Sequence, residues 1–196
     1  MKVWGLDFET GGVEPGRHAP VSIGLALTEG VEVLGEWEWI IGQVKKREYD
    51  VAALSISGIK WGQIKEALPL ENVLGLVRDV VTGMGGQHWH VVSHNSSFDQ
   101  AFYSDCKFLC GKWGSGKFAD RVFHPFPEIF CGPWHCTMRM ARGLLQLHDY
   151  KLDTVLADLG LERSGKLHGA AEDARLAAQA WSILRTMQIQ LETDVR

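Results

Sequence analysis

Two acidic residues near the start of the chain are the first candidates for chemistry. Asp7 and Glu9 lie two residues apart at the end of a strand expected over Lys2–Asp7. Because strand side chains alternate between the two faces of a sheet, both carboxylates point to the same side. Like charges at close range repel each other, and a divalent cation is the usual remedy. Taken alone, however, the pair is more typical of a solvated acidic turn leading into Thr10-Gly11-Gly12, and a cation site is the alternative.

Two further acidic residues each have an ordinary structural explanation. Asp99 ends the run His94-Asn95-Ser96-Ser97-Phe98-Asp99, in which Ser96 and Asp99 have the spacing of a capping box at a helix start. Asp173 follows His168 by five residues and falls in the first turn of an expected helix, where an acid suits the helix dipole. Neither feature indicates chemistry when it is taken alone.

The elements that must position these residues follow from the hydrophobic pattern. Strands are expected at Lys2–Asp7, Pro20–Thr28, Val31–Ile41 and Trp89–Ser93, and helices at about 71–83, 97–109, 137–147, 151–159 and 170–190. Three early strands with short turns predict a meander. Strands followed by alternating helices predict an α/β protein with a mixed sheet that helices cover.

Composition excludes several classes of protein. The 196 residues are 45% hydrophobic and 22% charged, which is not typical of disordered, collagenous or low-complexity chains. No apolar run approaches the ~18 residues of a membrane span, and the start lacks the apolar region of a signal peptide. We therefore expect a cytoplasmic protein with no membrane partner. The net charge of -4 does not indicate nucleic acid, so a polyanionic partner must be met locally or through metal ions.

The chain is expected to form one domain over residues 1–196, with a loop insertion at about 111–133. This segment is rich in glycine, lysine and aromatic residues. It would either guide a nucleic-acid strand with residues such as Lys112, Trp113 and Lys117, or form a solvated loop. The four cysteines are expected to be reduced and buried, although His124 and His135 lie among them and leave a zinc site open as the alternative.

In combination, the acidic motifs carry a specific signal. A strand-end Asp7-Phe8-Glu9, then Asn95 to Asp99 at a strand-to-helix turn, then His168 to Asp173 at the start of a late helix resemble the DEDDh 3′-to-5′ exonucleases. That family includes the proofreading subunit of bacterial replicative DNA polymerase, ribonuclease T and oligoribonuclease. The resemblance covers nearly the whole chain. It departs from the family at Ser57-Gly58-Ile59, where the family has His-Gly-Ile, and at Cys136, where the family usually has Asp.

The resemblance implies a fold and an activity. The fold would be a ribonuclease H-like mixed five-stranded sheet flanked by helices. The activity would be metal-dependent 3′-to-5′ exonucleolytic hydrolysis that releases nucleoside 5′-monophosphates from single-stranded or frayed ends, with DNA favoured over RNA. Two Mg²⁺ ions, for which Mn²⁺ can substitute, would be held by Asp7 bridging both, by Glu9 and Asp173 on the nucleophile side, and by Asp99 on the other. His168 would be the general base.

The resemblance also implies a substrate-binding set and partners. The set comprises Phe8, Thr10, Ile59, Asn95, Phe98 and His168. The expected partner is the 3′ end of a single-stranded DNA or RNA, and a polymerase or a second copy of the chain are further candidates. The alternative function is a non-catalytic module that keeps the fold for docking. Retention of all five catalytic candidates favours the enzyme, because a docking module does not need them.

Overall fold

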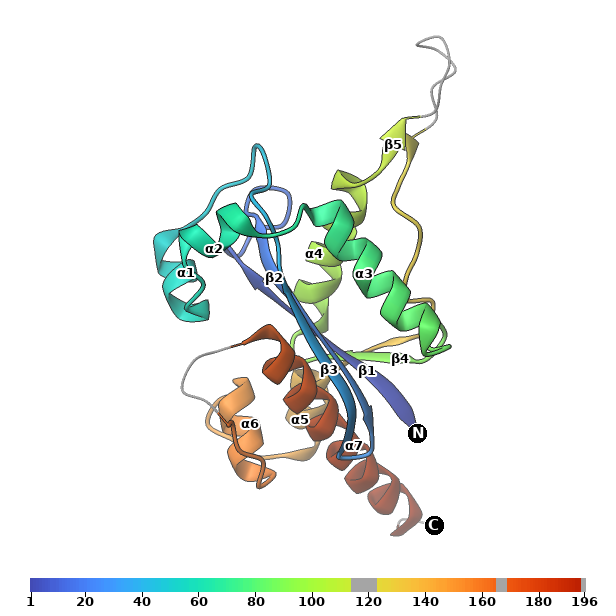
Figure 1. The fold of residues 1–196 in the computed structure, drawn as a ribbon. Helices are drawn as coiled ribbons and strands as arrows, with labels where there is room; N and C mark the ends of the chain where they lie inside the picture. Colours follow the sequence, from blue (N-terminus) through green and yellow to red (C-terminus); the bar gives the residue numbers. More distant parts are fainter. Residues whose placement is uncertain (114–122, 165–168, 195–196) are drawn as a thin grey trace.

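The computed structural model describes residues 1–113, 123–164 and 169–194 of the chain. Its centre is a five-stranded sheet with the strand order β3-β2-β1-β4-β7, and helices lie on both sides of this sheet (Figure 1). Antiparallel pairing joins β1, β2 and β3, and parallel pairing joins β4 to β1 and to β7. The strands are β1 (Lys2–Thr10), β2 (Pro20–Glu29), β3 (Glu32–Ile40), β4 (His90–Ser93) and β7 (Trp134–Cys136). The predicted meander and mixed sheet are confirmed.

The helices of the described residues include two that the sequence pattern did not predict. They are α1 (Val51–Ser57), α2 (Trp61–Glu66), α3 (Leu70–Gly83), α4 (Ser96–Leu109), α5 (Thr137–Leu144), α6 (Leu152–Asp158) and α7 (Ala170–Asp194). The unpredicted helices α1 and α2 have fewer than eight residues each, and a segment so short shows little helical periodicity. A two-stranded ribbon of β5 (Lys112–Trp113) and β6 (Phe123–His124) follows α4.

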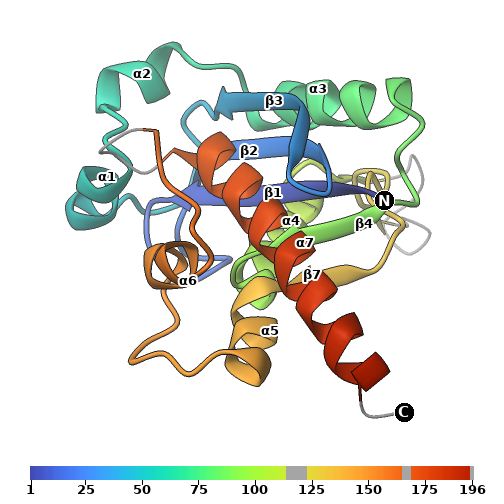
Figure 2. The ribbon, with the colours of Figure 1, turned by 90° about the horizontal axis from the view of Figure 1, so that it is seen from below.

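Alternate residues of β1 face two different layers. Trp4, Leu6 and Phe8 are buried in the main core, which also contains apolar residues of α3 and α4. Val3 lies on the opposite face in a cluster with Trp181 of α7. Figure 2 shows α7 crossing this second face. The period of two along β1 therefore directs Asp7 and Glu9 toward α7.

Small residues on β1 and β2 let α7 lie directly against the strands. A Cβ atom on Gly5 would lie 2.0 Å from the carbonyl oxygen of Ala174, and one on Gly24 would lie 2.0 Å from the carbonyl carbon of Ala170. Gly24 pairs with Asp7 across the two antiparallel strands. Both faces of β2 are thus buried, and the N-terminal turn of α7 lies beside Asp7.

The segment at 111–133 is described only in part. Lys107, at the end of α4, forms an ion pair with Glu128, and the exposed Lys112 lies 2.9 Å from Glu71. Lys117 lies outside the described residues. Two cations that could attract a nucleic-acid strand therefore already have carboxylate partners, and the insertion itself stays a prediction.

The cysteines and helices bear on two further expectations. Cys106 is buried as expected, but Cys131 is exposed, and all four thiols are free. The prediction that the cysteines are buried is therefore wrong for Cys131, because it lies in an irregular segment outside the core. No helix in the described part of the chain is long and apolar enough to cross a membrane.

The contact at Gly5 generates a prediction. Gly5→Ala should lower the free energy of unfolding by about 1–3 kcal/mol, because the new methyl group collides with backbone atoms of α7 that cannot move independently. It should also lower activity, because α7 carries Asp173. Thermal unfolding measures the first effect, and an assay of the exonuclease activity that the resemblance implies measures the second.

Gly75→Ala is the matched control, because a Cβ atom there meets open space on α3. It should leave stability unchanged or raise it by up to ~1 kcal/mol. Equal melting temperatures for Gly5→Ala and the wild type would contradict the account of this packing.

Candidate active site

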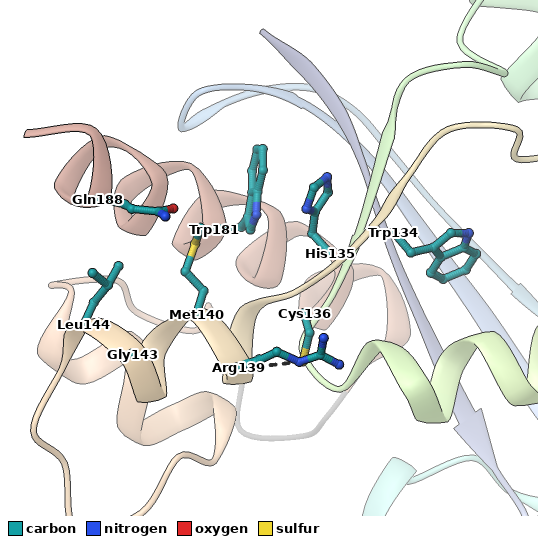
Figure 3. Close-up of a pocket in the computed structure, with 9 residues that line it drawn as sticks. All are labelled: Trp134, His135, Cys136, Arg139, Met140, Gly143, Leu144, Trp181 and Gln188. Atoms are coloured by element: carbon teal, nitrogen blue, oxygen red, sulfur yellow. Dashed lines mark hydrogen bonds between the residues drawn. The ribbon is translucent and has the colours of Figure 1, made fainter. Parts of the chain in front are cut away.

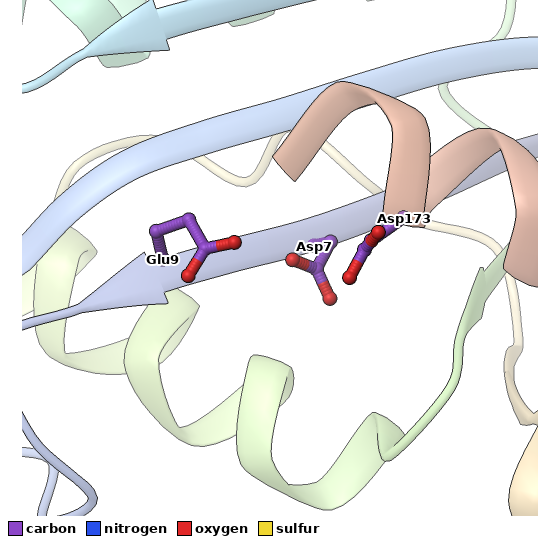
Figure 4. Close-up of side chains that lie close together, drawn as sticks. All are labelled: Asp7, Glu9 and Asp173. Carbon is purple, nitrogen blue, oxygen red and sulfur yellow. The ribbon is translucent and has the colours of Figure 1, made fainter. Parts of the chain in front are cut away.

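Three carboxylates from β1 and α7 gather at one point. Asp7, Glu9 and Asp173 each offer an oxygen atom, and these atoms lie within 4.8 Å of one another (Figure 4). Asp7 and Glu9 share a face of β1, and Asp173 belongs to the first turn of α7. Residues 166 positions apart in the sequence thus meet because α7 packs on the sheet. The close carboxylates need a compensating positive charge.

Asp99 joins this group from the other side of β1. Its Oδ1 atom accepts a hydrogen bond of 3.2 Å from the backbone N–H of Phe8, and the residue is only 2% exposed. The helix begins at Ser96 with Asn95 in the cap position. The local alternative for this run, a capping box from Ser96 to Asp99, does not form, because Ser96 is already the first helical residue and the Asp99 carboxylate bonds to a neighbouring strand.

Burial and mutual repulsion act on the carboxylates in the same direction. Burial raises the pKa of Asp7 well above its usual value, and the charges of Asp99, Asp173 and Glu9 raise it further. Burial likewise raises the pKa of Asp99 to about 8, although the N–H of Phe8 favours its charged form and lowers the pKa. Both shifts mean that ionised carboxylates are unfavourable here without a nearby cation.

Arg163 supplies one positive charge at this site. Its guanidinium forms an ion pair with Asp173, and its Nε atom donates to Asp153 at 2.6 Å. Its side chain is 14% exposed. Sequence spacing gave no signal for this residue, because it lies in the connection between α6 and α7 and reaches Asp173 only in the folded chain. One guanidinium does not balance the carboxylates of Asp7, Glu9, Asp99 and Asp173.

The donor set fits a hard divalent cation. Carboxylate oxygens are the ligands that Mg²⁺ and Mn²⁺ prefer, and cation binding would favour the charged forms that burial disfavours. Asp7, Glu9 and Asp173 would hold such an ion, with Asp99 close by. Among the described residues, this is the cluster whose three or more His, Cys, Asp or Glu side chains lie close enough for a shared ion. The described cysteines form no such group, and the side chain of His124 is not described.

A cavity of about 270 Å³ opens beside the carboxylates of β1. Three residues of the expected substrate-binding set line it, namely Phe8, Thr10 and Phe98. Ile59 does not, because it is buried in a separate cluster with Val21 and Ile64. Ile56 of α1 lines the cavity and is 60% exposed, although the sequence gave no reason to choose it.

The remaining predicted residues have different positions. Asn95 is exposed at the start of α4, where its Oδ1 atom accepts a 3.0 Å hydrogen bond from Ser97. Ser57 is buried and bonds within its own turn, donating to the carbonyl oxygen of Leu54 at 3.1 Å. His168 lies outside the described residues, so its role as general base stays a prediction.

Glu38 is a second residue that the sequence did not indicate. It lies on β3, accepts a 3.2 Å hydrogen bond from the hydroxyl of Ser22 on β2, and accepts a 3.3 Å bond from the backbone N–H of Ala171. Glu38 thereby satisfies a free N–H at the start of α7 and fixes that helix end to the sheet.

A separate cavity of about 350 Å³ lies at the edge of the sheet, between β7, α5 and α7 (Figure 3). Trp134, Met140 and Trp181 contribute to its wall. Cys136 also lines it, and its sulfur accepts a hydrogen bond from the backbone N–H of Arg139, so that it caps α5. Cys136, at the position where the resembled family usually has Asp, is therefore the N-cap residue of α5.

Comparison with known proteins identifies relatives that match most of the length of this chain. Residues 4–181 match the family model RNase_T, described as Exonuclease. A PolC-type DNA polymerase III of Thermotoga maritima is 29% identical over 180 residues, which are 90% of this chain and 11% of that protein. The chain thus spans about a tenth of the length of this curated relative.

Solved structures share the fold at lower identity. The nuclease domain of 3′hExo, a DEDDh family member bound to rAMP, superposes with a TM-score of 0.71 and 16% identity, covering 96% of this chain and 92% of that chain. Exonuclease I of E. coli, in complex with a dT13 oligonucleotide, gives a TM-score of 0.73 and 14% identity, covering 98% of this chain and 42% of that one.

The raised pKa of Asp99 generates a prediction about the metal-free protein. A carboxyl whose pKa rises on folding from 3.8 to about 8 binds more protons in the folded state, so its contribution to stability is lost as pH increases across that range. Asp99→Asn has no such proton. In EDTA, the melting temperature of Asp99→Asn minus that of the wild type should therefore increase from pH 5 to pH 8. A difference that is constant with pH would contradict the shift.

Proposed function

The chain belongs to the exonuclease family that the RNase_T model describes, and from that premise we propose that it is a cation-dependent 3′-to-5′ exonuclease of the DEDDh type that releases nucleoside 5′-monophosphates from single-stranded or frayed DNA ends. One observation carries the proposal. Asp7, Glu9 and Asp173 come together where α7 meets β1, the first two half-buried and the third buried, and Asp99 is held against the same strand. The first three acids crowd around one position, which suits charge-neutralising cations and a phosphodiester.

The reaction is hydrolysis of the last phosphodiester bond. Two Mg²⁺ ions held by the four carboxylates would neutralise the phosphate charge, activate water and stabilise the leaving oxygen. The water oxygen bonds to phosphorus, the bond from phosphorus to the 3′ oxygen of the preceding nucleotide breaks, and that oxygen gains a proton. The imidazole of His168 takes the proton from the attacking water, because a neutral imidazole is a suitable base near pH 7.

The small cavity beside the carboxylates suits the terminal nucleoside. Phe8, Phe98 and Ile56 give it apolar walls on which a base and a sugar can pack, and its described lining contains no Lys or Arg. A terminal nucleoside carries no phosphate beyond the scissile one, so it needs no cation there. Asn95 and Ile59 are kept as proposed substrate contacts on the family resemblance alone.

Similarity to a DNA polymerase favours DNA over RNA as the substrate. The curated relative is a PolC-type DNA polymerase III, and the polymerase is therefore the first partner to test by co-purification. A homodimer is the second candidate.

A cleavage assay tests the activity. Oligonucleotides of DNA and RNA labelled at the 5′ end should be shortened one nucleotide at a time in Mg²⁺ or Mn²⁺, faster for DNA, and not in EDTA or when the 3′ end is blocked. Asp7→Asn should lose more than ~10²-fold in rate, because a bridging ligand serves both ions.

The exposed acid Asp79 on α3 provides the control, and Asp79→Asn should keep the wild-type rate. Binding of oligonucleotides without any shortening, in the presence of either metal, would favour the docking module instead. Cleavage that continues undiminished in EDTA would exclude the role of the carboxylate cluster.

The proposed base is tested separately. His168→Ala should slow single-turnover cleavage by roughly 10²–10⁴-fold while the affinity for Mn²⁺ is retained. The rise of the wild-type rate around the imidazole reference pKa of ~6.5 should flatten in the variant. His148→Ala, at an exposed position between α5 and α6, is the matched control. If His168→Ala is inactive only because Mn²⁺ no longer binds, the histidine is a ligand and not the base.

A further inference from the structure

A second, larger cavity beside Asp173 is lined by two residues that each have a buried polar atom without a partner. Among the described residues, three buried side-chain nitrogen or oxygen atoms have no hydrogen-bond partner, and two of them belong to His94 and Arg163. Both residues line the same cavity of about 730 Å³. A buried polar group without a partner destabilises the folded protein, because it has lost its hydrogen bonds to water. Two such residues on one cavity therefore indicate a place that a polar ligand completes.

The free atom of Arg163 defines one property of the ligand. Its Nε and Nη1 atoms are already held by Asp153 and Asp173, so the guanidinium is fixed in position. The unpartnered Nη2 atom can only donate hydrogen bonds. Its partner must be an acceptor, and a guanidinium binds oxygen anions such as phosphate especially well.

The unpartnered atom of His94 defines a second property of the ligand, a hydrogen-bond donor. Its Nε2 atom lies 2.9 Å from the carbonyl oxygen of Tyr150, which can only accept, so Nε2 carries the hydrogen. Burial lowers the pKa of His94, which keeps the ring neutral. The unpartnered Nδ1 atom is then an acceptor, and a sugar hydroxyl or a water molecule on a polar ligand supplies its hydrogen.

Two exposed cationic side chains also line this cavity. Arg142 and Lys151 line the cavity, and neither lies within ion-pair distance of a carboxylate of the described residues. The guanidinium of Arg142 lies 5.6 Å from the centre of the Tyr150 ring. The acidic residues that line the cavity already have partners. Arg163 pairs with Asp153 and Asp173, and Asp149 accepts a hydrogen bond from the backbone N–H of Lys151.

The two cavities meet at the catalytic carboxylates. Asp173 lines both the large cavity and the small one that contains Asp7 and Glu9. The large cavity has three cationic residues in its lining, whereas the described lining of the small one has none. A strand cut between these cavities would have its terminal nucleoside in the small cavity and its remaining phosphates along the cationic one.

Resting on the exonuclease function proposed above, we propose that the large cavity binds the nucleotides immediately 5′ of the cleaved bond, with Arg163 Nη2 donating to a phosphate oxygen and Arg142 and Lys151 contacting the next phosphates. Arg163 then has two tasks: it balances the charge of Asp173 and fixes the strand beside it. Substrate length becomes a determinant of rate, because a mononucleotide ester has no phosphate 5′ of the scissile one for Arg142 and Lys151 to contact.

Two substrates separate this subsite from the catalytic centre. Thymidine 5′-(p-nitrophenyl phosphate) has the terminal nucleotide but a nitrophenyl group in place of the preceding nucleotide, whereas a ten-nucleotide oligothymidylate fills both cavities. In the double variant Arg142→Gln/Lys151→Gln, the fold-loss of kcat/KM on the oligonucleotide should exceed the fold-loss on the ester by at least tenfold.

Binding gives a readout that does not need catalysis. For a fluorescently labelled oligothymidylate, the plot of log affinity against log salt should become shallower by about 1.4 in the double variant, since each lost phosphate contact on a single strand removes ~0.7. Lys2→Gln/Arg185→Gln is the matched control, because it removes the same charge outside the cavity lining. Arg163→Lys should also weaken binding, because it keeps a charge beside Asp173 but removes Nη2.

The possible outcomes distinguish failure of the proposed subsite from failure of the proposed exonuclease function. Equal losses on ester and oligonucleotide would overturn the subsite, because the cations would then act on the catalytic centre or the fold. Affinity and salt dependence equal to those of the control variant would also overturn it. If the wild type hydrolyses neither substrate, the exonuclease function fails, and the binding experiment alone still tests the cavity as a single-strand site.

Discussion

The direct contact between α7 and the backbone of β1 and β2 is the constraint on which the site depends. Gly5 and Gly24 leave no room for a side chain under α7, so the helix lies against the strands themselves. Because strand side chains alternate, the residue two positions after Gly5 points at the same helix. That residue is Asp7, and the helix presents Asp173 to it. The geometry of the carboxylates thus follows from close packing and from the absence of two Cβ atoms.

This packing brings acidic side chains close together, which is electrostatically unfavourable. Burial raises the pKa of Asp7 and Asp99, and their mutual charges act in the same direction. The chain offsets part of that cost with the guanidinium of Arg163 on Asp173 and the N–H of Phe8 on Asp99. The negative charge that remains uncompensated favours a bound cation. A site that is unfavourable by itself and favourable with a divalent ion couples cation binding to the ionisation that hydrolysis requires.

Sequence reasoning predicted the parts of the site that local patterns encode. Asp7 and Glu9 were placed on one face by strand alternation, and Asp173 in a first turn by helical spacing, and the folded chain brings them together. The segment around Asp99 was ambiguous by itself, because a capping box and a bond to a distant strand have the same local spacing, and only the combination of motifs indicated a place in the site. Arg163 gave no signal, because its contacts with Asp153 and Asp173 depend on how a connection folds back over α6 and α7.

The central claim is that packing of α7 on β1 creates a divalent-cation site for phosphodiester hydrolysis. Crystals grown with Mn²⁺ and thymidine 5′-monophosphate test it most directly, because anomalous scattering locates the metal independently of any assay. The account predicts a strong anomalous peak within ligand distance of Asp7, Glu9 and Asp173, with the nucleotide phosphate beside it. No peak at this cluster at saturating Mn²⁺, with the nucleotide bound elsewhere, would contradict it.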